Sequence, residues 1–351
     1  MNFLYGKMQT ILVLAPGLTH TRAGHPENHT RMTAVQRSLE RSGVLADVTA
    51  VSPQPASIEQ LRRVHTPSLI ERIRTVSRIG GGLLDHGDTY ATADSYELAR
   101  LAAGGCCTAV DQIMNGSARN GLALVRPPGH HAESNRVSGF CLFNNAAVAA
   151  RHAQANYGLK RVLIFDFDVH HGNGTQEIFY DDASVLFTSV HMFAPYFYPG
   201  IGSFDEVGHG AGVGYTLNVP LPPGVGDVGY CRVMNELVRP RVEMFQPEMI
   251  LVSVGFDAHW QDPLASEGLS LTGYAKIARN LIELADKLCN GRILFILEGG
   301  YHLDVLTAGV HNVIYSLLGR DEILDSFGAM PYAESDVTQL LHKLQNRHLP
   351  K

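Results

Sequence analysis

The chain has 351 residues, of which 45% are hydrophobic, and its formal net charge is −6 at pH 7. This acidic balance, without a block of lysine or arginine, argues against a nucleic-acid-binding surface, and no apolar run approaches the roughly 20 residues that a membrane span needs. The five cysteines show no C-x-x-C spacing, which favours buried thiols in a reducing compartment over a disulfide framework or a zinc ribbon. Because Met1–Met8 is too short for a signal peptide, we expect a soluble, cytoplasmic protein.

Apolar strand patterns alternate with helical patterns along the chain. The first half is predicted to contain strand Thr10–Ala15, helix Thr30–Ser42, helix Pro67–Ser77 behind a Thr66 cap, a helix from a capping Asp94 to Asn115, strand Leu122–Val125 and helix Asn144–Tyr157. The second half is predicted to contain strand Val162–Phe165, strand Val185–Val190, edge strand Tyr215–Pro220, helix Asp227–Phe245, strand Met249–Val254, a helix capped by Thr272 that runs to Leu288, strand Ile293–Leu297 and helix Val305–Leu318.

Most of the predicted strands end in a polar loop that carries His, Asp or Tyr. This order predicts an α/β fold with a mostly parallel sheet, flanked by helices, whose site lies at the carboxyl ends of the strands. No linker or internal repeat interrupts the pattern, so we expect one domain over residues 1–351, with a core at about 10–320 and a tail at 321–351.

The stretch Arg161–Thr175 carries the strongest chemical signal. Its buried strand leads into Asp166, Asp168 and His170, and the spacing of two places these groups on one side of an extended chain. Buried carboxylates are costly unless a cation lies among them, and a divalent metal is the simplest explanation. Asp257, which follows another buried strand, would complete an Asp–His–Asp set with a position open for water, as in catalytic zinc sites.

An isolated D-x-H is more often a helix cap beside solvated loop residues, but complementary groups at several strand ends reverse that interpretation. His130 and His131 follow a stiff Pro-Pro-Gly turn, and neighbouring histidines can act as general base and acid in a hydrolysis. Taken alone, two adjacent histidines more often lie on the surface without a catalytic role. Tyr301, after Glu298-Gly-Gly, could place a hydroxyl beside a developing oxyanion, although a lone tyrosine more often serves packing.

At these residues the sequence closely resembles the histone deacetylase family, including acetylpolyamine amidohydrolases and bacterial deacetylase-like amidohydrolases. The matching blocks cover nearly the whole chain: His25–Asn28 with Arg31, Arg126–His131, Gly139-Phe140, Asp166–Thr175, Gly255–Asp257 with Asp262–Leu264, and Glu298–Tyr301. The resemblance implies the arginase/deacetylase α/β fold and zinc-dependent hydrolysis of N-acyl amides, with one Zn²⁺ per chain.

Carried over by position, the resemblance gives roles to the site residues. Asp168, His170 and Asp257 look like the zinc ligands. His130 looks like the inner histidine paired with Asp166, His131 like the general base and acid, and Tyr301 like the residue that polarises the carbonyl.

The partner of His131 departs from the pattern of many eukaryotic class I members, which carry Asp where this chain carries Asn173. The departure resembles class II and bacterial members, and an amide should make His131 less basic than a carboxylate would.

The resemblance also implies a narrow acyl-lysine channel and two monovalent cation sites for K⁺ or Na⁺. The channel residues would be Arg31, Asp88, Gly139, Phe140, Tyr198, Leu264 and Gly299. The first cation site would use Asp166, Asp168, His170, Ser189 and Val190, partly through backbone oxygens. The second would use Phe179, Asp182, Val185 and Tyr215.

The expected substrate is an acyl-lysine of a protein or peptide, with broad specificity as an extension. Action on a small acylated amine, as in an acetylpolyamine amidohydrolase, is the alternative. A polyamine-selective relative carries glutamate at the position of Leu264, which favours acyl-lysine here. Two other readings are a non-hydrolytic binding protein, which would lack a site residue, and a binuclear manganese ureohydrolase, which would need further aspartates. A homo-oligomer is compatible with the long loop at 193–214.

Overall fold

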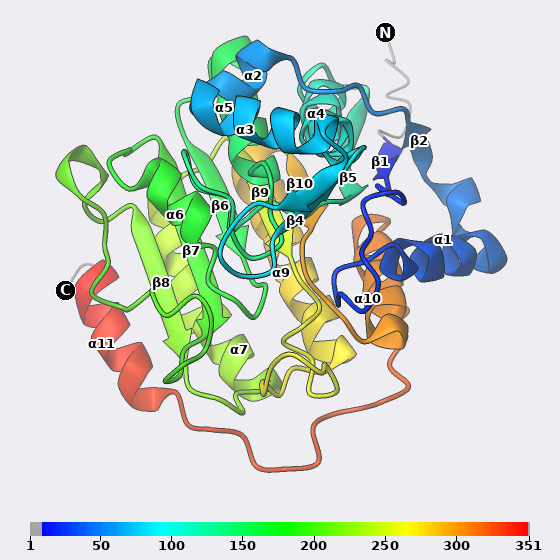
Figure 1. Ribbon diagram of the computed structural model, residues 1–351. Helices are drawn as coiled ribbons and strands as arrows, with labels where there is room; N and C mark the ends of the chain where they lie inside the picture. Colours follow the sequence, from blue (N-terminus) through cyan, green and yellow to red (C-terminus); the bar gives the residue numbers. More distant parts are fainter. Residues whose placement is uncertain (1–8, 350–351) are drawn as a thin grey trace, which may run out of the picture.

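Eight parallel strands form one sheet in the order β2-β1-β5-β10-β9-β6-β7-β8 (Figure 1). The computed structural model describes residues 9–349, so the expectation for Met1–Met8 lies outside the described residues. The sheet strands are β1 (Gln9–Ala15), β2 (Thr49–Val51), β5 (Ala118–Val125), β6 (Val162–Asp166), β7 (Val185–Met192), β8 (Thr216–Leu221), β9 (Met249–Val254) and β10 (Ile293–Leu297). Strands β3 (Gly81–Leu83) and β4 (Tyr90–Thr92) form a separate antiparallel hairpin. All seven predicted strands are present, and the parallel α/β prediction is confirmed.

Helices cover both faces of the sheet. They are α1 (Thr30–Ser42), α2 (Ile58–Arg62), α3 (Pro67–Arg78), α4 (Ser95–Met114), α5 (Asn145–Tyr157), α6 (Asn173–Phe179), α7 (Asp227–Val233), α8 (Arg239–Phe245), α9 (Leu271–Cys289), α10 (Leu303–Leu317) and α11 (Thr338–His348). None of those within residues 9–349 combines the length and apolarity that crossing a lipid bilayer requires.

The two faces of the sheet belong to two separate hydrophobic cores. In β9, Ile250 and Val252 pack into the core formed with α1, α9 and α10, whereas Met249 and Leu251 pack into the core formed with α3, α4 and α5. Because successive side chains of a strand point to opposite faces, a strand covered on both sides must be apolar throughout. This is why the strands could be predicted as uninterrupted apolar runs.

One predicted helix cap is wrong, and a second is confirmed in its position but not in its hydrogen bond. Helix α9 begins after Ser270, whose side chain accepts the backbone N–H of Gly273 at 3.0 Å, while the Thr272 hydroxyl donates to Oδ2 of Asp325 at 2.7 Å. Serine in extended backbone just before the first helical residue is the better cap, because its oxygen reaches the free N–H groups of the first turn. Asp94 precedes α4 as predicted, but its side chain makes no capping hydrogen bond.

The predicted helix Asp227–Phe245 is interrupted. A π-helical turn at Met234–Val238 separates α7 from α8, and Pro240 lies in the first turn of α8. Proline has no N–H to donate to the carbonyl four residues earlier, which favours a local change of helical geometry. Strand β7 is also two residues longer than predicted, so His191 lies inside it and contacts the Gly202 carbonyl at 3.0 Å.

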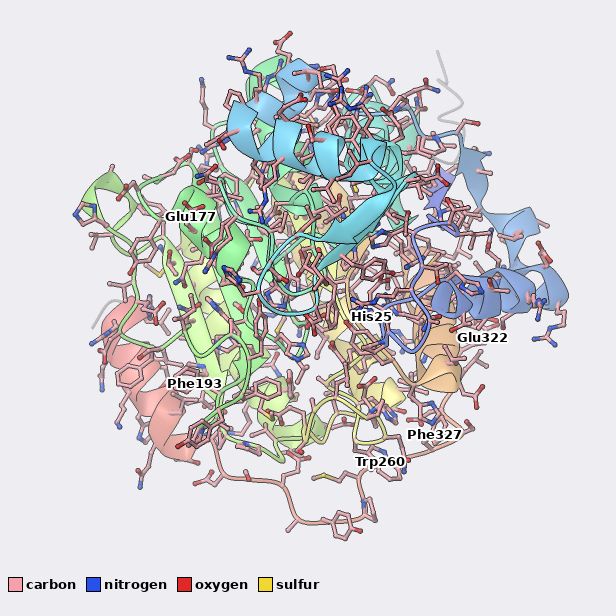
Figure 2. The ribbon with its side chains drawn as sticks, in the orientation of Figure 1. His25, Glu177, Phe193, Trp260, Glu322 and Phe327 are labelled. Carbon is pink, nitrogen blue, oxygen red and sulfur yellow. The ribbon has the colours of Figure 1, made fainter. Side chains whose placement is uncertain are left out.

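The tail, which the sequence did not explain, crosses the molecule. Residues 318–337, which we call the strap, run from the end of α10 to α11, and α11 packs against β8 (Figure 1). Side chains of the body hold the strap: Trp260 donates to the Gly328 carbonyl at 3.0 Å, close to Phe327 (Figure 2). Glu334 of the strap accepts the backbone N–H of Gly229 at 2.9 Å.

Candidate metal centre and active site

The carboxyl ends of the four central strands bring the predicted site residues together. Strands β5, β10, β9 and β6 are neighbours, and they lead into His130, Glu298, Asp257 and Asp166 respectively. All four side chains are buried. In a parallel sheet the crossover connections place these ends at one edge, so residues far apart in sequence meet there.

Asp168, His170 and Asp257 form the candidate metal centre. One ligand atom of each lies within 4.8 Å of the others, and Nδ1 of His170 is 3.1 Å from Asp168 Oδ1 and 3.4 Å from Asp257 Oδ2. Oδ2 of Asp257 is buried and makes no hydrogen bond with any residue of the described range 9–349. Two carboxylates, one imidazole and a free buried oxygen are a donor set that fits a divalent cation such as Zn²⁺.

Glycines make room for this crowding. A Cβ added to Gly255 would lie 2.0 Å from Oδ2 of Asp168, and one added to Gly299 would lie 2.2 Å from Oδ2 of Asp257. Any other residue at either position would therefore displace a carboxylate of the metal centre.

The electrostatics indicate an excess of negative charge. Burial raises the pKa of Asp257, and the neighbouring Asp168 raises it further. Burial alone would lower the pKa of His170, but the nearby carboxylates of Asp168 and Asp257 outweigh this and raise it to about 9. Both shifts follow from carboxylates held close together, and a cation among them would offset the same charge.

The adjacent histidines have opposite electrostatic environments. Nδ1 of His130 lies 3.0 Å from Asp166 Oδ2, and although burial lowers the pKa of His130, Asp166 and Asp168 together raise it to about 10. Nδ1 of His131 lies 2.7 Å from Asn173 Oδ1. Burial, and then the charge of His130, lower the pKa of His131 well below its usual value. The pKa values of the two neighbouring rings are therefore shifted in opposite directions.

Asn173 fixes the tautomer of His131. Its amide nitrogen donates to Glu133 Oε1 at 3.0 Å, so its oxygen faces His131 and accepts the proton on Nδ1. Nε2 of His131 is left as the acceptor, which is the form required of a base.

A cavity of about 170 Å³ opens beside the metal centre. Six of the seven predicted channel residues line it: Asp88, Gly139, Phe140, Tyr198, Leu264 and Gly299. His130, His131, Asp168, His170 and Tyr301 also face it, together with Pro128, which the sequence did not indicate.

Aromatic rings form the walls of the cavity. The Phe140 and Tyr301 rings lie 6.3 Å apart edge to face, and the Tyr198 ring lies 4.9 Å from His131. Phe197, which we did not predict, stacks on the ring of His170 at 5.0 Å. Its position beside Tyr198 in the sequence was the available signal.

Arg31, the seventh predicted channel residue, lies behind Tyr301 and does not line the cavity. Its guanidinium is 5.0 Å from the centre of the Tyr301 ring, and it donates to the carbonyls of Gly300 and Glu298 at 2.8 and 2.7 Å. The same guanidinium pairs with Glu27 at 3.0 Å.

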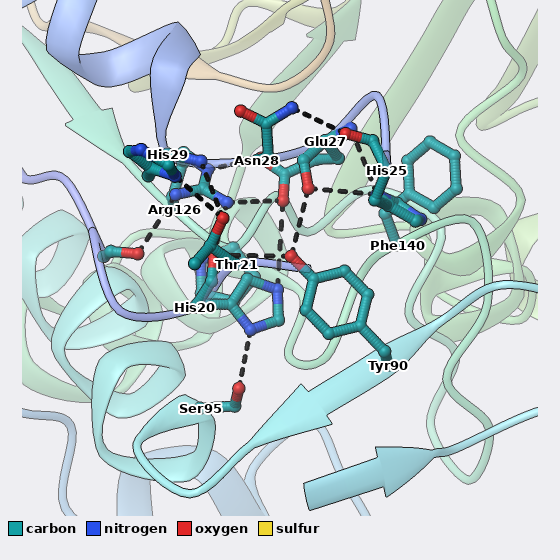
Figure 3. Close-up of polar contacts among 12 residues, drawn as sticks. His20, Thr21, His25, Glu27, Asn28, His29, Tyr90, Ser95, Arg126 and Phe140 are labelled. Atoms are coloured by element: carbon teal, nitrogen blue, oxygen red, sulfur yellow. Dashed lines mark hydrogen bonds and ion pairs between the residues drawn. The ribbon is translucent and has the colours of Figure 1, made fainter. Parts of the chain in front are cut away.

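Glu27 is a functional neighbour that sequence reasoning missed, and Figure 3 shows its contacts. The side chain is fully buried and accepts hydrogen bonds from Arg126 through both oxygens, while the Tyr90 hydroxyl donates to its backbone carbonyl at 3.1 Å. Although burial raises the pKa of Glu27, Arg126 and Arg31 outweigh it and lower the pKa to about 2. Its place inside the His25–Asn28 block was the signal that could have identified it.

The residues predicted for the monovalent cations lie in two places. Asp166 pairs in register with Ser189 of β7, next to Val190 and the metal centre. The second set lies around the start of β7, where the Asp182 carboxylate pairs with Arg151 at 2.6 Å. Val185 opens β7, Phe179 ends α6 and Tyr215 precedes β8.

Comparisons with known proteins show which family the chain resembles in sequence and in fold. A family model described as the histone deacetylase domain matches residues 25–317. The chain is 39% identical to histone deacetylase 10, chloroplastic, of Oryza sativa, over 95% of this chain and 80% of that protein. It is 40% identical to a histone deacetylase-like amidohydrolase of Pseudomonas aeruginosa, over 80% of this chain and 73% of that protein. The solved structure of the HDA15 HD domain matches with a TM-score of 0.89 and 39% identity, covering 97% of this chain and 94% of that one.

The metal centre predicts that Asp257→Ala removes the metal. With one carboxylate gone, the site loses the ligand whose oxygen is free, so we expect zinc content after dialysis to fall from about one per chain to near zero. Elemental analysis of the purified protein measures this. Glu267→Gln, which alters a buried carboxylate outside the site, serves as the control and should keep its zinc. Retention of a full equivalent by Asp257→Ala would remove Asp257 from the metal centre.

The buried ion pairs of Glu27 with Arg31 and Arg126 predict a large and pH-dependent loss of stability in Glu27→Gln. Two buried guanidinium groups would lose their carboxylate, which typically costs about 3–5 kcal/mol. Because the pKa of Glu27 falls from 4.5 to about 2 on folding, its contribution is complete above about pH 4.5 and disappears as the pH falls toward 2.

Urea unfolding at several pH values should therefore show that the free energies of unfolding of the wild type and of Glu27→Gln converge below about pH 4.5. The control is Glu59→Gln, which breaks an exposed ion pair with Arg63 and should cost less than about 1 kcal/mol. If the difference in free energy of unfolding between the wild type and Glu27→Gln did not change with pH, Glu27 would not act as a charged group in the folded protein.

Proposed function

The chain belongs to the histone deacetylase family of hydrolases, and on this premise we propose that it is a zinc-dependent deacetylase acting on the acyl-lysine of peptides or proteins. One observation carries the proposal: the Asp–His–Asp metal centre, through Asp168 and His170, borders the same cavity as His131 and Tyr301. None of the groups needed for amide hydrolysis is replaced, which argues against a binding protein that has lost its chemistry.

Asp168, His170 and Asp257 would hold the zinc ion. Zn²⁺ at this position supplies Lewis-acid polarisation of the substrate carbonyl and lowers the pKa of water from about 15.7 towards ~7. Asp166 and Asp168 raise the pKa of His130, and the charge of His130 adds to burial in lowering the pKa of His131.

His131 is the proposed general base and acid. Its Nε2 accepts a proton from the attacking water while Nδ1 stays bound to Asn173, and Nε2 then returns the proton to the leaving amine. Its low pKa keeps the ring neutral and ready to accept this proton.

Tyr301 is the proposed donor to the oxyanion. Burial raises the pKa of its hydroxyl well above 10, so the group keeps its proton at neutral pH and can donate it as a hydrogen bond. Arg31 supports the ring from behind.

The cavity walls support a linear aliphatic substrate. Phe140 and Tyr198 are flat apolar surfaces that suit a chain of methylene groups, and Leu264 adds a further apolar contact. We also propose that K⁺ or Na⁺ binds near Asp166 and Ser189, where main-chain oxygens would complete the ligand set.

We predict that Tyr301→Phe lowers kcat by about 10²–10³, because one oxyanion donor is lost while the ring and its packing stay in place. Steady-state kinetics on an acetyl-lysine peptide test this, with zinc content measured in the same sample and expected to be unchanged. Full activity in Tyr301→Phe would show that the tyrosine has another role.

We predict that Asn173→Asp raises the pKa of His131, since a carboxylate stabilises the imidazolium more than an amide does. The reaction needs neutral His131, so the acid limb of the kcat/KM profile should move to higher pH. A pH–rate profile from pH 5 to 9 measures the shift. If the limb stayed in place, His131 would not be the titrating base.

A substrate comparison separates the two candidate amides. We expect acetyl-lysine peptides to be turned over in preference to N-acetylputrescine, and Leu264→Glu to move that preference towards the polyamine, because an acidic group at the wall attracts a second ammonium group. Measuring kcat/KM for both substrates with both proteins tests this. Exclusive turnover of N-acetylputrescine by the wild type would favour the acetylpolyamine amidohydrolase alternative.

A further inference from the structure

The backbone that carries Tyr301 has little stiffness of its own. Tyr301 follows Gly299 and Gly300, and Gly300 adopts a φ of +113°, a conformation that other residues rarely take. Glycine restricts the chain least of all residues, so the sequence alone leaves the direction of the tyrosine poorly defined. A hydrogen-bond donor for an oxyanion has to be held to within a fraction of an ångström, and other parts of the molecule must therefore fix it.

One side of this loop is held through its carbonyl groups. Arg31 binds the carbonyls of Glu298 and Gly300, and Asp168 accepts the backbone N–H of Gly299 at 2.8 Å. These contacts end at Gly300. They hold the carbonyl side of the Gly300–Tyr301 peptide group but leave its N–H, and the N–H of the next peptide group, to be held by another residue.

The carboxylate of Asp262 holds the N–H of this peptide group and of the next one. Its Oδ2 accepts the backbone N–H of Tyr301 at 2.7 Å and of His302 at 3.1 Å. Its Oδ1 accepts the backbone N–H of Leu264 at 3.0 Å. The side chain is only 5% exposed, so these three N–H groups provide most of its solvation, and a carboxylate can accept all of them at once.

We infer that Asp262 is a positioning residue for the reaction: it fixes the Tyr301 hydroxyl at the cavity and ties the backbone of Tyr301 to that of Leu264, which also lines the cavity. This inference rests on the role proposed for Tyr301. Asp262 does not line the cavity and is not one of the three metal-centre residues, so its effect on the reaction passes through the tyrosine.

Asp262→Asn tests the inference, since an amide nitrogen cannot accept an N–H and at least one of the three bonds must break. A displacement of about 1 Å at a reacting group can cost ~10²-fold in rate. We expect kcat on an acetyl-lysine peptide to fall by about 10- to 100-fold, while KM changes less than threefold and zinc content does not change. The inference would be overturned if the fall in kcat/KM came mainly from a higher KM, or if Asp262→Asn lost its zinc.

Glu267→Gln is the matched control. Glu267 lies on the same segment after β9, is 2% exposed and accepts the backbone N–H of Val225 at 2.8 Å, but it has no contact with Tyr301 among the residues described. A general loss of stability from removing a buried carboxylate should appear in both variants, whereas the loss of kcat should appear only in Asp262→Asn.

The double variant with Tyr301→Phe provides the decisive measurement. If Asp262 acts through the hydroxyl, adding Asp262→Asn to Tyr301→Phe should cost less than about threefold more, because the positioned group is already absent. Losses that multiply would overturn the inference and leave the role of Tyr301 intact. Full activity in Tyr301→Phe alone would overturn the role of the tyrosine, and the inference with it. If Asp262→Asn does not fold, Asp262→Ser, whose hydroxyl still accepts one N–H, takes its place in the cycle.

Discussion

Buried negative charge at the end of the central strands is the constraint on which the rest of the site depends. Asp166, Asp168 and Asp257 each have at most 1% of their surface exposed, so water contributes little to their solvation. Their arrangement is stable only if positive charge is supplied locally. His130 supplies part of it, and the free oxygen of Asp257 indicates where a cation supplies the remainder.

The same charges give two neighbouring histidines different pKa values. Asp166 and Asp168 raise the pKa of His130, whereas burial, and after it the charge of His130, lower the pKa of His131. The difference in pKa therefore does not require a carboxylate beside His131. The amide of Asn173 is sufficient to orient the His131 ring. On the other side of the cavity, Arg126, Glu27 and Arg31 form a second charged group that fixes the loop before Tyr301.

The sequence allowed much of this to be predicted, for physical reasons. Strands buried on both faces are apolar runs, and the chemical groups follow them directly, so the sheet and the set of Asp168, His170 and Asp257 could be predicted. What could not be predicted depends on partners that are distant in sequence. Ser270, and not Thr272, caps α9, and the Thr272 hydroxyl instead donates to Asp325, more than fifty residues later. The role of Glu27 likewise depends on Arg126, which is 99 positions away.

The strap and α11 connect the two halves of the sheet through the chain, in addition to the hydrogen bonds between neighbouring strands. Helix α10 contacts β5, towards one end of the strand order, whereas α11 contacts β8, the last strand at the other end. An edge strand is ordinarily the first to separate from a sheet, and its unpaired backbone groups are open to pairing with another molecule. Here the strand cannot fray without also releasing the chain that crosses back from α10. We expect the edge to melt together with the sheet as one cooperative unit, and the outermost strand to be shielded from intermolecular β-pairing.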